Sequence, residues 1–191
     1  MTSHESTVTI HMAASLDGFI ARRDGRVDWM DTSDVFPGGE SLGADATAAF
    51  LGSIDCYVMG SRTYETALRF ESEGHGWAYG DTPTVVLTTR DLPRTRATVE
   101  LCAGDLARIV DERLRPRFRR IWVVGGGAVA GECLRRGVAD EVCYSILPIA
   151  IGVGIPFFAS LDRDVALHLA EVHAYDNGVV DLRYQVRHGV R

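Results

Sequence analysis

Short apolar segments alternate with longer amphipathic segments along most of this chain, and that alternation restricts the fold more than any other feature of the sequence. Short apolar runs bounded by turn residues are typical of buried strands, whereas the amphipathic segments have the spacing of helices. The polar, glycine-rich residues 71–82 are predicted to be a loop. This alternation predicts an α/β fold built on a mostly parallel sheet. The predicted strands are residues 8–14, 55–59, 83–89, 119–124 and 142–147, and the predicted helices are residues 45–53, 61–69, 105–114 and 128–136.

The C-terminal segments, residues 166–175 and 179–187, are predicted to form a β-hairpin. Asp176, Asn177 and Gly178 join the two segments. An Asn-Gly pair between two β-patterned runs is a strong hairpin signal. The hairpin is expected to give the otherwise parallel sheet an antiparallel edge.

The composition excludes several classes of protein. With 191 residues, of which 46% are hydrophobic and 24% charged, the chain is predicted to form one globular domain over residues 1–191. The net charge is −6 and the cationic residues are scattered, so nucleic-acid binding is not expected. All 20 cationic side chains are arginine, which excludes lysine-dependent chemistry such as a Schiff base or a Walker lysine.

The sequence does not suggest a membrane protein, a metal site or a disulfide framework. No apolar stretch approaches the ~20 residues that a transmembrane helix needs, and the N-terminus lacks the apolar region of a secretory signal. The four cysteines form no C-x-x-C pair, and His11 and His75 have no metal-ligand spacing. We therefore expect a cytoplasmic protein without a metal, and we assign neither histidine a catalytic role.

Three of the predicted strands end in segments rich in glycine and hydroxyl residues. The carboxyl ends of parallel strands lie at one edge of a sheet, where ligands usually bind and where helix N-termini attract anions. Taken singly, each segment could also be a helix cap, a polar strand end or a tight turn. Together they predict a site for a phosphorylated ligand. The segments are Gly60-Ser61-Arg62-Thr63, Thr88-Thr89-Arg90 and Gly125-Gly126-Gly127-Ala128-Val129.

A Rossmann dinucleotide fold does not explain the last of these segments. Its fingerprint belongs to the first βα turn and is followed by an acidic residue at the end of the next strand. Here the glycines come late in the chain, and Asp140 and Glu141 precede the next predicted strand. The order of these residues argues against a standard Rossmann domain.

Five segments resemble the dihydrofolate-reductase-like superfamily, and most closely its branch that contains the reductase domain of riboflavin biosynthesis. The resemblance runs from about Val8 to Arg187, in the order and spacing of that family. It implies a three-layer fold with a mostly parallel central sheet, helices on both faces and an antiparallel C-terminal hairpin. It also implies a homodimer. The five segments are residues 14–21, 58–65, 86–90, 123–127 and 152–158.

The resemblance implies that the protein binds NADPH across the edge of the sheet. In this family, the residues that match Gly125 and Gly126 are joined by a cis peptide, which lets the backbone approach the cofactor. Arg62 and Arg90 favour NADPH over NADH, because arginine suits the additional phosphate. The implied cofactor-binding residues are Ala13 and Ile20 at the nicotinamide, Gly60, Ser61, Arg62 and Thr63 at the phosphates, Thr88, Thr89 and Arg90 at the ribose 2′-phosphate, and Gly125, Gly126, Gly127, Ala128 and Val129 at the pyrophosphate.

The substrate side of the site departs from dihydrofolate reductases. Their arginine for the glutamyl tail of folate is absent, because the matching residues 80–83 read Gly-Asp-Thr-Pro. Two acids are candidate catalytic residues. Asp34 has the spacing after Trp29 of a substrate-binding acid, or it is a solvated loop residue. Asp17 lies in the loop that faces the cofactor, or it stabilises the turn before Gly18. The candidate substrate-binding residues are Trp29, Phe50 and Ser145.

These observations lead to three functional hypotheses. The first is hydride transfer from NADPH to a C=N or C=O bond of a small planar heterocycle, such as a pterin, a dihydrofolate or a ribosylamino-pyrimidine. The second is a nucleotide-binding protein that keeps the fold but has weak or no catalysis. The third is the riboflavin-pathway 5-amino-6-(5-phosphoribosylamino)uracil reductase, although a lysine often present beside that family's first strand is absent here.

Overall fold

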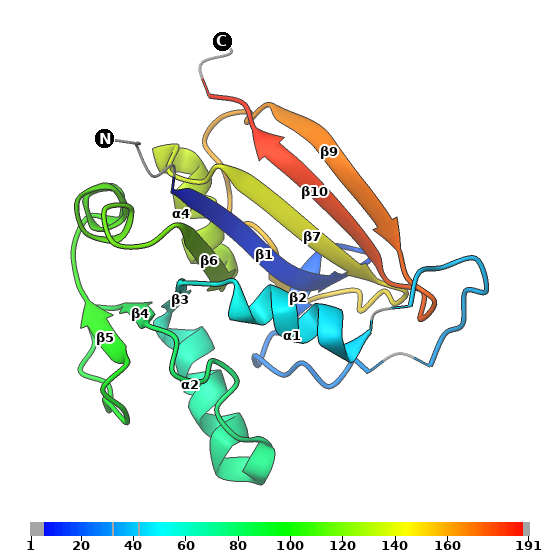
Figure 1. The fold of residues 1–191 in the computed structure, drawn as a ribbon, viewed down its shortest axis with the longest axis horizontal. Coiled ribbons are helices and arrows are strands. Elements are labelled where there is room, and N and C mark those ends of the chain that lie inside the picture. The colour runs from blue at the N-terminus through cyan, green and yellow to red at the C-terminus, as the bar shows by residue number, and fades with distance from the viewer. Residues whose placement is uncertain (1–5, 32, 42, 189–191) are drawn as a thin grey trace.

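The computed structural model describes residues 6–31, 33–41 and 43–188, and its main element is an eight-stranded sheet (Figure 1). The strands follow the order β5-β4-β3-β6-β1-β7-β10-β9 across the sheet. Two short strands, β2 (Phe19–Ala21) and β8 (Ile155–Pro156), pair separately. The strands of the large sheet are β1 (Thr7–Ser15), β3 (Cys56–Gly60), β4 (Thr84–Leu87), β5 (Val99–Cys102), β6 (Arg120–Gly125), β7 (Glu141–Leu147), β9 (Leu167–Ala174) and β10 (Val180–Val186).

Most of the sheet is parallel, and only its C-terminal edge is antiparallel. The strands from β5 to β7 in the sheet order run parallel to their neighbours, whereas β10 runs antiparallel to both β7 and β9. At the turn between β9 and β10, Gly178 has a φ of 80°, and its N–H donates to the carbonyl of Tyr175 at 3.0 Å. Glycine adopts this left-handed conformation without steric strain. The predicted C-terminal hairpin is confirmed.

Helices cover both faces of the sheet. The α3 helix, the π-helical turn that follows it and α4 pack on the face that includes Val8 and Ile10, whereas α2 packs on the opposite face against Tyr57 and Met59. In Figure 1, α1 lies in front of the sheet and α4 behind it. This confirms the three-layer arrangement. Within the described residues, no helix has the length and apolar character needed to cross a membrane. The helices are α1 (Ala44–Gly52), α2 (Ser61–Phe70), α3 (Leu106–Arg108) and α4 (Gly127–Arg136), with π-helical turns at Glu71–His75 and Ile109–Leu114.

The alternation of side chains along β1 places polar groups beside α1. Val8 and Ile10 are fully buried in the core on the α4 side. Thr9, His11 and Ala13 are half-buried and point to the other face, because successive side chains of a strand alternate. The central strand therefore supplies apolar side chains to one layer and a histidine to the other.

The predicted elements are present with shifted ends, and two predictions were incomplete. The predicted loop at residues 71–82 begins with the π-helical turn Glu71–His75, which continues α2 until Gly74 adopts a φ of 92°. The strands β2, β5 and β8 were not predicted. β5 is only four residues long, too short for a clear alternation, and its extended conformation depends on parallel pairing with β4.

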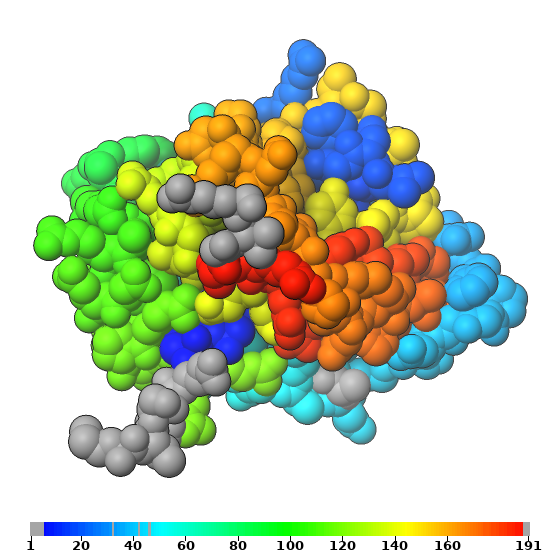
Figure 2. Space-filling view, turned by 90° about the horizontal axis from the view of Figure 1, so that it is seen from above, coloured from blue at the N-terminus to red at the C-terminus, as the bar shows by residue number. Residues whose placement is uncertain are grey.

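The segment before α1 is bound to the end of the C-terminal hairpin. The N–H of Glu40 donates to the carbonyl of Ala174 (2.8 Å), and the N–H of Asp176 donates to the carbonyl of Glu40 (3.0 Å). Figure 2 shows this segment at the surface beside β9 and β10. These bonds fix the chain between β2 and α1 next to the carboxyl end of β7.

Candidate functional site

The three turns singled out in the sequence lie at one edge of the sheet. β3, β4 and β6 are adjacent and parallel, and their ends are in register, with Gly60 opposite Leu87 and Met59 opposite Gly125. The segments that begin at Gly60, Thr88 and Gly125 therefore leave the sheet side by side. This is the convergence that the sequence predicts for a phosphorylated ligand.

Glycine is required where these turns meet. Gly125 and Gly126 are joined by a cis peptide, as the resemblance implies. A Cβ atom on Gly125 would lie 3.4 Å from Thr63 Oγ1, and one on Gly60 would lie 3.1 Å from Val129 Cγ2. The glycines therefore pack directly against the side chains of Thr63 and Val129, and Gly126 is only partly buried.

Two helices begin at this edge without a side-chain cap. Gly60 is the N-cap of α2, and Gly126 is the N-cap of α4. Glycine has no side chain that could bind the first N–H groups of a helix, which carry the positive end of the helix dipole. Two converging helix N-termini of this kind suit an anionic phosphate ligand.

Two arginines flank the same edge. The guanidinium of Arg90 donates to both carboxylate oxygens of Glu65, at 2.9 and 2.5 Å, and the backbone N–H of Arg90 donates to Thr88 Oγ1 at 3.0 Å. The hydrogen bonds from Arg90 hold the pKa of Glu65 below its usual value, and the charge of Arg62 acts in the same direction. Arg62 and Arg90 are both exposed. An anionic ligand at this edge would therefore meet two cations.

The other residues of the expected cofactor site lie nearby. The Cδ1 atom of Ile20 is 3.9 Å from the position that a Cβ of Gly126 would occupy. Ala13 lies near the carboxyl end of β1, opposite Ser145 of β7. Binding of NADPH by these residues stays a prediction. The residues in the turns themselves are Ser61, Thr89, Gly127, Ala128 and Val129.

Asp17 holds two loops together after β1. Its Oδ1 accepts hydrogen bonds from Ser15 Oγ (2.6 Å) and from the N–H of Ile151 (3.1 Å), and its Oδ2 accepts one from the N–H of Gly152 (2.6 Å). These donors, and first the Ser15 hydroxyl, lower the pKa of Asp17 because they stabilise the charged carboxylate. These contacts correspond to the turn-stabilising role considered for Asp17. They also join its turn to the loop that contains Ile151 and Gly152. A catalytic role of Asp17 stays a prediction.

Trp29 and Asp34 line an open cavity of about 460 Å³ beside the hairpin. Trp29 is 3% exposed, and its Nε1 has no hydrogen-bond partner in the described part of the chain. Asp34 is exposed and lies against Gly178, where a Cβ atom would overlap its carboxylate. The structure thus brings these two candidates together, and their role in substrate binding stays a prediction. The other lining residues are Asp31, Ser33, Pro148 and Ile149.

Phe50 and Ser145, the other two substrate candidates, meet at His11. The His11 ring stacks on Trp122 with centroids 4.9 Å apart, and its centroid lies 5.9 Å from that of Phe50. Nε2 of His11 is 2.9 Å from Ser145 Oγ. The indole N–H of Trp122 donates to the backbone carbonyl of His11 at 2.7 Å. His11 is therefore held between α1 and the sheet by aromatic contacts and two polar contacts.

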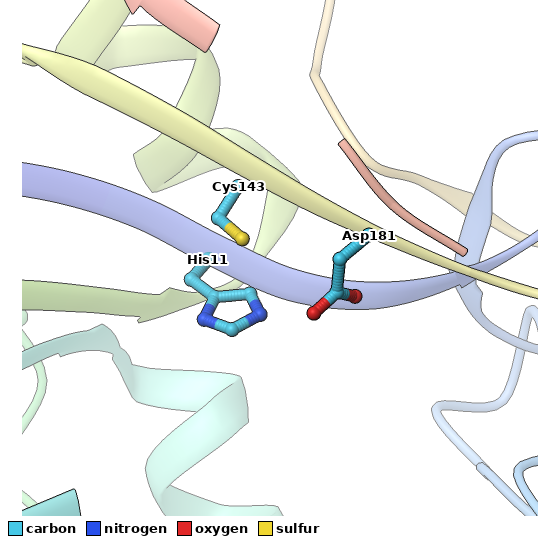
Figure 3. Close-up of side chains that lie close together, drawn as sticks. All are labelled: His11, Cys143 and Asp181. Atoms are coloured by element: carbon cyan, nitrogen blue, oxygen red, sulfur yellow. The ribbon is translucent and has the colours of Figure 1, made fainter. Parts of the chain in front are cut away.

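Cys143 and Asp181 complete a polar group that we call the His11 cluster: His11, Cys143, Ser145 and Asp181. Neighbouring strands bring it together, with His11 of β1 opposite Cys143 of β7, and Ser145 of β7 opposite Asp181 of β10. The candidate ligand atoms of His11, Cys143 and Asp181 all lie within 4.8 Å of one another. In Figure 3, the imidazole and the Asp181 carboxylate face each other, with the thiol beside the ring.

Burial determines the protonation of this cluster. It lowers the pKa of His11, an effect that Asp181 opposes and Arg183 assists. Burial also raises the pKa of Cys143 to about 12, and the negative charge of Asp181 contributes. Near neutral pH, His11 is therefore a neutral imidazole with one N–H and one lone pair, and Cys143 is a thiol.

Asp181 has one bonded and one unbonded carboxylate oxygen. Its Oδ2 accepts a hydrogen bond from the Tyr175 hydroxyl at 3.2 Å. Its Oδ1 is buried and has no hydrogen-bond partner among the residues that the structure describes. A buried acceptor without a donor is unfavourable for folding. The cluster thus contains a buried acceptor that no donor among the described residues satisfies.

The sequence alone does not reveal this cluster, because its members are close only in the sheet. His11 lacks metal-ligand spacing, and Asp181 lies in a hairpin strand without a recognisable motif. One signal was present, since Cys143 and Ser145 occupy alternate positions of a strand and must share a face. Finding Asp181 requires the register between β7 and β10, which the sequence alone does not supply.

Comparisons with known proteins identify the family. The model of the RibD C-terminal domain matches residues 57–180. The uncharacterized protein YwjB of Bacillus subtilis is 27% identical over 177 residues, which cover 92% of this chain and 95% of YwjB. The crystal structure of a putative riboflavin biosynthesis protein from Shewanella sp. PV-4 has a TM-score of 0.78 and 25% identity, and the match covers 95% of this chain and 99% of that one.

A larger enzyme shares the fold. The deaminase and 5-amino-6-(5-phosphoribosylamino)uracil reductase of Thermotoga maritima has a TM-score of 0.68 at 16% identity, with 97% of this chain and 58% of that chain covered. The fold expected from the sequence is confirmed by these likenesses, and the family match includes the turns at Gly60, Thr88 and Gly125. The match spans more than half of the chain, so this protein belongs to the RibD C-terminal domain family.

Proposed function

We propose that this protein is an NADPH-dependent reductase that transfers a hydride to a small planar heterocycle. One observation carries the proposal, namely that two helix N-termini capped only by glycine converge at one sheet edge with Arg62 and Arg90. Helix N-termini suit a pyrophosphate, and exposed arginines suit the ribose 2′-phosphate that distinguishes NADPH from NADH. The donor groups at this edge therefore fit NADPH in both charge and hydrogen bonding.

The residues of this chain then bind and orient the reactants. When bound, NADPH supplies the hydride. Gly125 and Gly126 keep side chains away from the edge, and Ile20 lies against their turn. Ala13 is opposite Ser145, so the His11 cluster is adjacent to the position expected for the nicotinamide. A flat substrate would lie beside Phe50, whose ring already contacts that of His11.

Family membership favours a particular case of this reaction. The Thermotoga relative is named for reduction of a phosphoribosylamino-uracil, and the family takes its name from the RibD C-terminal domain. A ribosylamino-pyrimidine is therefore the first substrate to test, ahead of pterins and dihydrofolate. Oxidation of NADPH is measured by absorbance with each compound. Turnover of any of them supports the reductase, whereas tight NADPH binding without turnover of a panel that also includes flavins and quinones favours the nucleotide-binding alternative.

Titration of the full-length protein with NADPH and NADH tests the cofactor. We expect NADPH to bind roughly tenfold tighter than NADH, because a charge-assisted hydrogen bond to phosphate is worth about 1.5–3 kcal/mol. Arg62→Ala and Arg90→Ala should each weaken NADPH binding by about fivefold to tenfold and leave NADH binding within about twofold. Arg108→Ala is the matched control, because this exposed arginine pairs with Glu112 and lies in none of the three turns. Absence of NADPH binding at about 1 mM would refute the proposal.

A further inference from the structure

We propose that the protein binds a small diphosphate or triphosphate anion at the amino ends of the parallel strands, in a cavity walled by Arg117 and Arg119. The cavity has a volume of about 410 Å³, which is in the range of small-molecule pockets. The site is separate from the turns proposed to hold NADPH, so it does not depend on the reductase activity. The lining residues are Asp55, Arg115, Pro116, Arg117, Phe118 and Arg119.

The cavity lies at the start of two strands whose other ends carry the proposed cofactor turns. Asp55 precedes β3 and Arg119 precedes β6, whereas Gly60 and Gly125 end the same two strands. These strands are five and six residues long, so the two ends lie about 16–20 Å apart. A small ligand in the cavity therefore contacts neither of these turns.

The segment that forms most of the cavity is strongly basic. The cationic residues are scattered along most of the chain, but five of the 20 arginines fall within residues 113–120, which contain no acid. This run is cationic in a protein whose net charge is −6. A local excess of positive charge attracts anions, and one guanidinium can donate two hydrogen bonds to a phosphate. The five are Arg113, Arg115, Arg117, Arg119 and Arg120.

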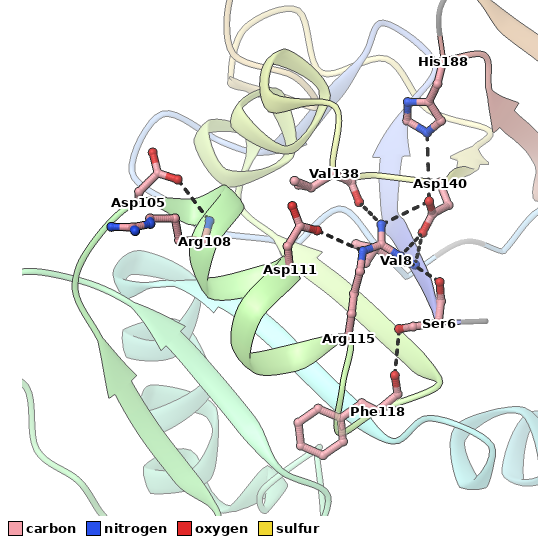
Figure 4. Close-up of polar contacts among 10 residues, drawn as sticks. All are labelled: Ser6, Val8, Asp105, Arg108, Asp111, Arg115, Phe118, Val138, Asp140 and His188. Carbon is pink, nitrogen blue, oxygen red and sulfur yellow. Dashed lines mark hydrogen bonds and ion pairs between the residues drawn. The ribbon is translucent and has the colours of Figure 1, made fainter. Parts of the chain in front are cut away.

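The structure engages two of these arginines fully and leaves Arg117 available. Arg113 donates to Glu100, and Arg115 binds two carboxylates and two backbone carbonyls (Figure 4). Arg117 is exposed. Among the described residues, its guanidinium has a long ion pair with the same Glu100, at 3.9 Å, and lies 4.9 Å from the centre of the Phe118 ring. A phosphate at Arg117 would therefore displace no hydrogen-bonded protein partner.

The backbone around the cavity is held in place by hydrogen bonds. Oδ2 of Asp55 accepts the N–H groups of Arg119 and Arg120, both at 2.9 Å, and the Asp55 N–H donates to the carbonyl of Arg120 at 3.0 Å. The N–H of Phe118 donates to the carbonyl of Leu114 at 2.9 Å. Asp55 is the one acid among the lining residues, and its two donors offset part of its negative charge. A fixed backbone lowers the entropy lost when a ligand binds.

The arrangement favours a small polyphosphate over other anions. Arg117 and Arg119 are two residues apart on either side of the half-buried Phe118, so an anion that meets both needs charge at more than one point. A nucleic acid or a membrane would need a broad cationic face. Here the acids Glu100 and Asp111 are bonded to neighbouring arginines of the same segment and interrupt such a face.

Calorimetric titration of the full-length protein with inorganic pyrophosphate tests the site. We expect a Kd below about 1 mM at 0.15 M salt, and binding of orthophosphate at least tenfold weaker. Arg117→Gln and Arg119→Gln should each weaken pyrophosphate binding by about tenfold, the range for a hydrogen bond between charged groups. Arg120→Gln is the matched control, because this exposed arginine belongs to the same segment but does not line the cavity. It should stay within about twofold.

A second set of titrations separates this site from the carboxyl edge, which also suits a pyrophosphate. A double variant, Arg62→Ala with Arg90→Ala, should keep pyrophosphate affinity within about twofold, and Arg117→Gln should keep NADPH affinity within the same range. ADP is titrated against the double variant. Affinity equal to that of pyrophosphate supports a site for the diphosphate alone, and tighter binding supports a site that also contacts the nucleoside.

Several results would overturn the inference. Absence of pyrophosphate binding at about 1 mM would remove the site. An equal loss in Arg120→Gln would show diffuse surface charge instead of a cavity, and tighter binding of a single-stranded oligonucleotide than of pyrophosphate would assign the segment to nucleic acid. Melting temperatures check that the variants fold. If Arg117→Gln does not fold, Arg117→Lys keeps the charge without the planar fork, and unchanged affinity in it would also refute the site.

Discussion

Around Arg115, at the amino ends of the parallel strands, polar groups are bonded to one another, whereas at the carboxyl ends Trp29 Nε1 and Asp181 Oδ1 have no partner within the described residues. Arg115 shows the first arrangement (Figure 4), since its guanidinium donates to the carbonyls of Ser6 (2.7 Å) and Val138 (2.8 Å) and to Asp140 Oδ1 (3.1 Å). Asp140 Oδ2 in turn accepts the N–H of Val8 at 2.7 Å. This network joins the start of β1, the turn after α3 and the turn before β7.

At the carboxyl ends of the strands, several polar groups lack a side-chain or backbone partner within the described residues. The N-caps Gly60 and Gly126 offer no side chain to their helices, and Trp29 Nε1 and Asp181 Oδ1 are buried without partners among the described residues. The comparison suggests that the polar groups around Arg115 stabilise the fold and that those at the carboxyl edge are kept for a ligand.

The largest expected effect comes from Gly127→Ala at the carboxyl edge. A Cβ atom at this position would overlap the backbone carbonyl of Pro156 in β8, and backbone cannot move aside as a side chain can. We expect the free energy of unfolding to fall by about 3 kcal/mol, and NADPH affinity to fall because the start of α4 shifts. Chemical denaturation and NADPH titration measure the two effects. Gly52→Ala is the control, since nothing lies within 4 Å of its Cβ position.

Arg115→Ala tests the amino edge. The change leaves Asp140 and two carbonyls without their donor, so the free energy of unfolding should fall by about 2–3 kcal/mol. NADPH affinity should stay within about twofold, because the network lies at the far end of the strands. Urea denaturation measures the free energy of unfolding of Arg115→Ala and of the control Arg108→Ala. The control should change little, because the pair of Arg108 with Glu112 is exposed. An equal loss of cofactor binding in Arg115→Ala would contradict the division between the two edges.

Glu65→Gln tests how the Glu65–Arg90 pair affects ligand binding at the carboxyl edge. The substitution removes the carboxylate that binds Arg90 and so frees a cation for a ligand phosphate. We expect NADPH to bind about threefold tighter at low salt, with less gain at high salt because ions screen exposed charges. Weaker NADPH binding would show instead that Glu65 is needed to hold Arg90 in place. Titrations at two salt concentrations distinguish these outcomes.

The smallest expected effect is the pH dependence of the stability that the Glu65–Arg90 pair contributes. Arg90 lowers the pKa of Glu65 from its ordinary 4.5, so the pair stabilises the folded state above that pH and the contribution is lost as the pH falls through the lower folded value. Because both side chains are exposed, the difference in unfolding free energy between wild type and Glu65→Gln should be a few tenths of a kcal/mol at pH 7. It should shrink as the pH falls below 4.5. A difference that grows on acidification would contradict this sign.

Local sequence signals were enough to predict much of the carboxyl edge. Glycines at 60, 125 and 178 mark turns because their conformations or contacts exclude a side chain. The rule that parallel strands end at a common edge then brings the first two together. β5 escaped prediction because its four residues have no periodicity of their own and depend on β4.

By itself, the sequence determined most of the strands and helices, the C-terminal hairpin and the turns at the carboxyl edge of the sheet, because backbone conformation and side-chain alternation are local. Only the tertiary structure decided that His11 faces Cys143 and that Ser145 faces Asp181. Register between strands distant in the chain is set by the packing of whole faces, and a shift of one residue would turn each of these side chains to the opposite face.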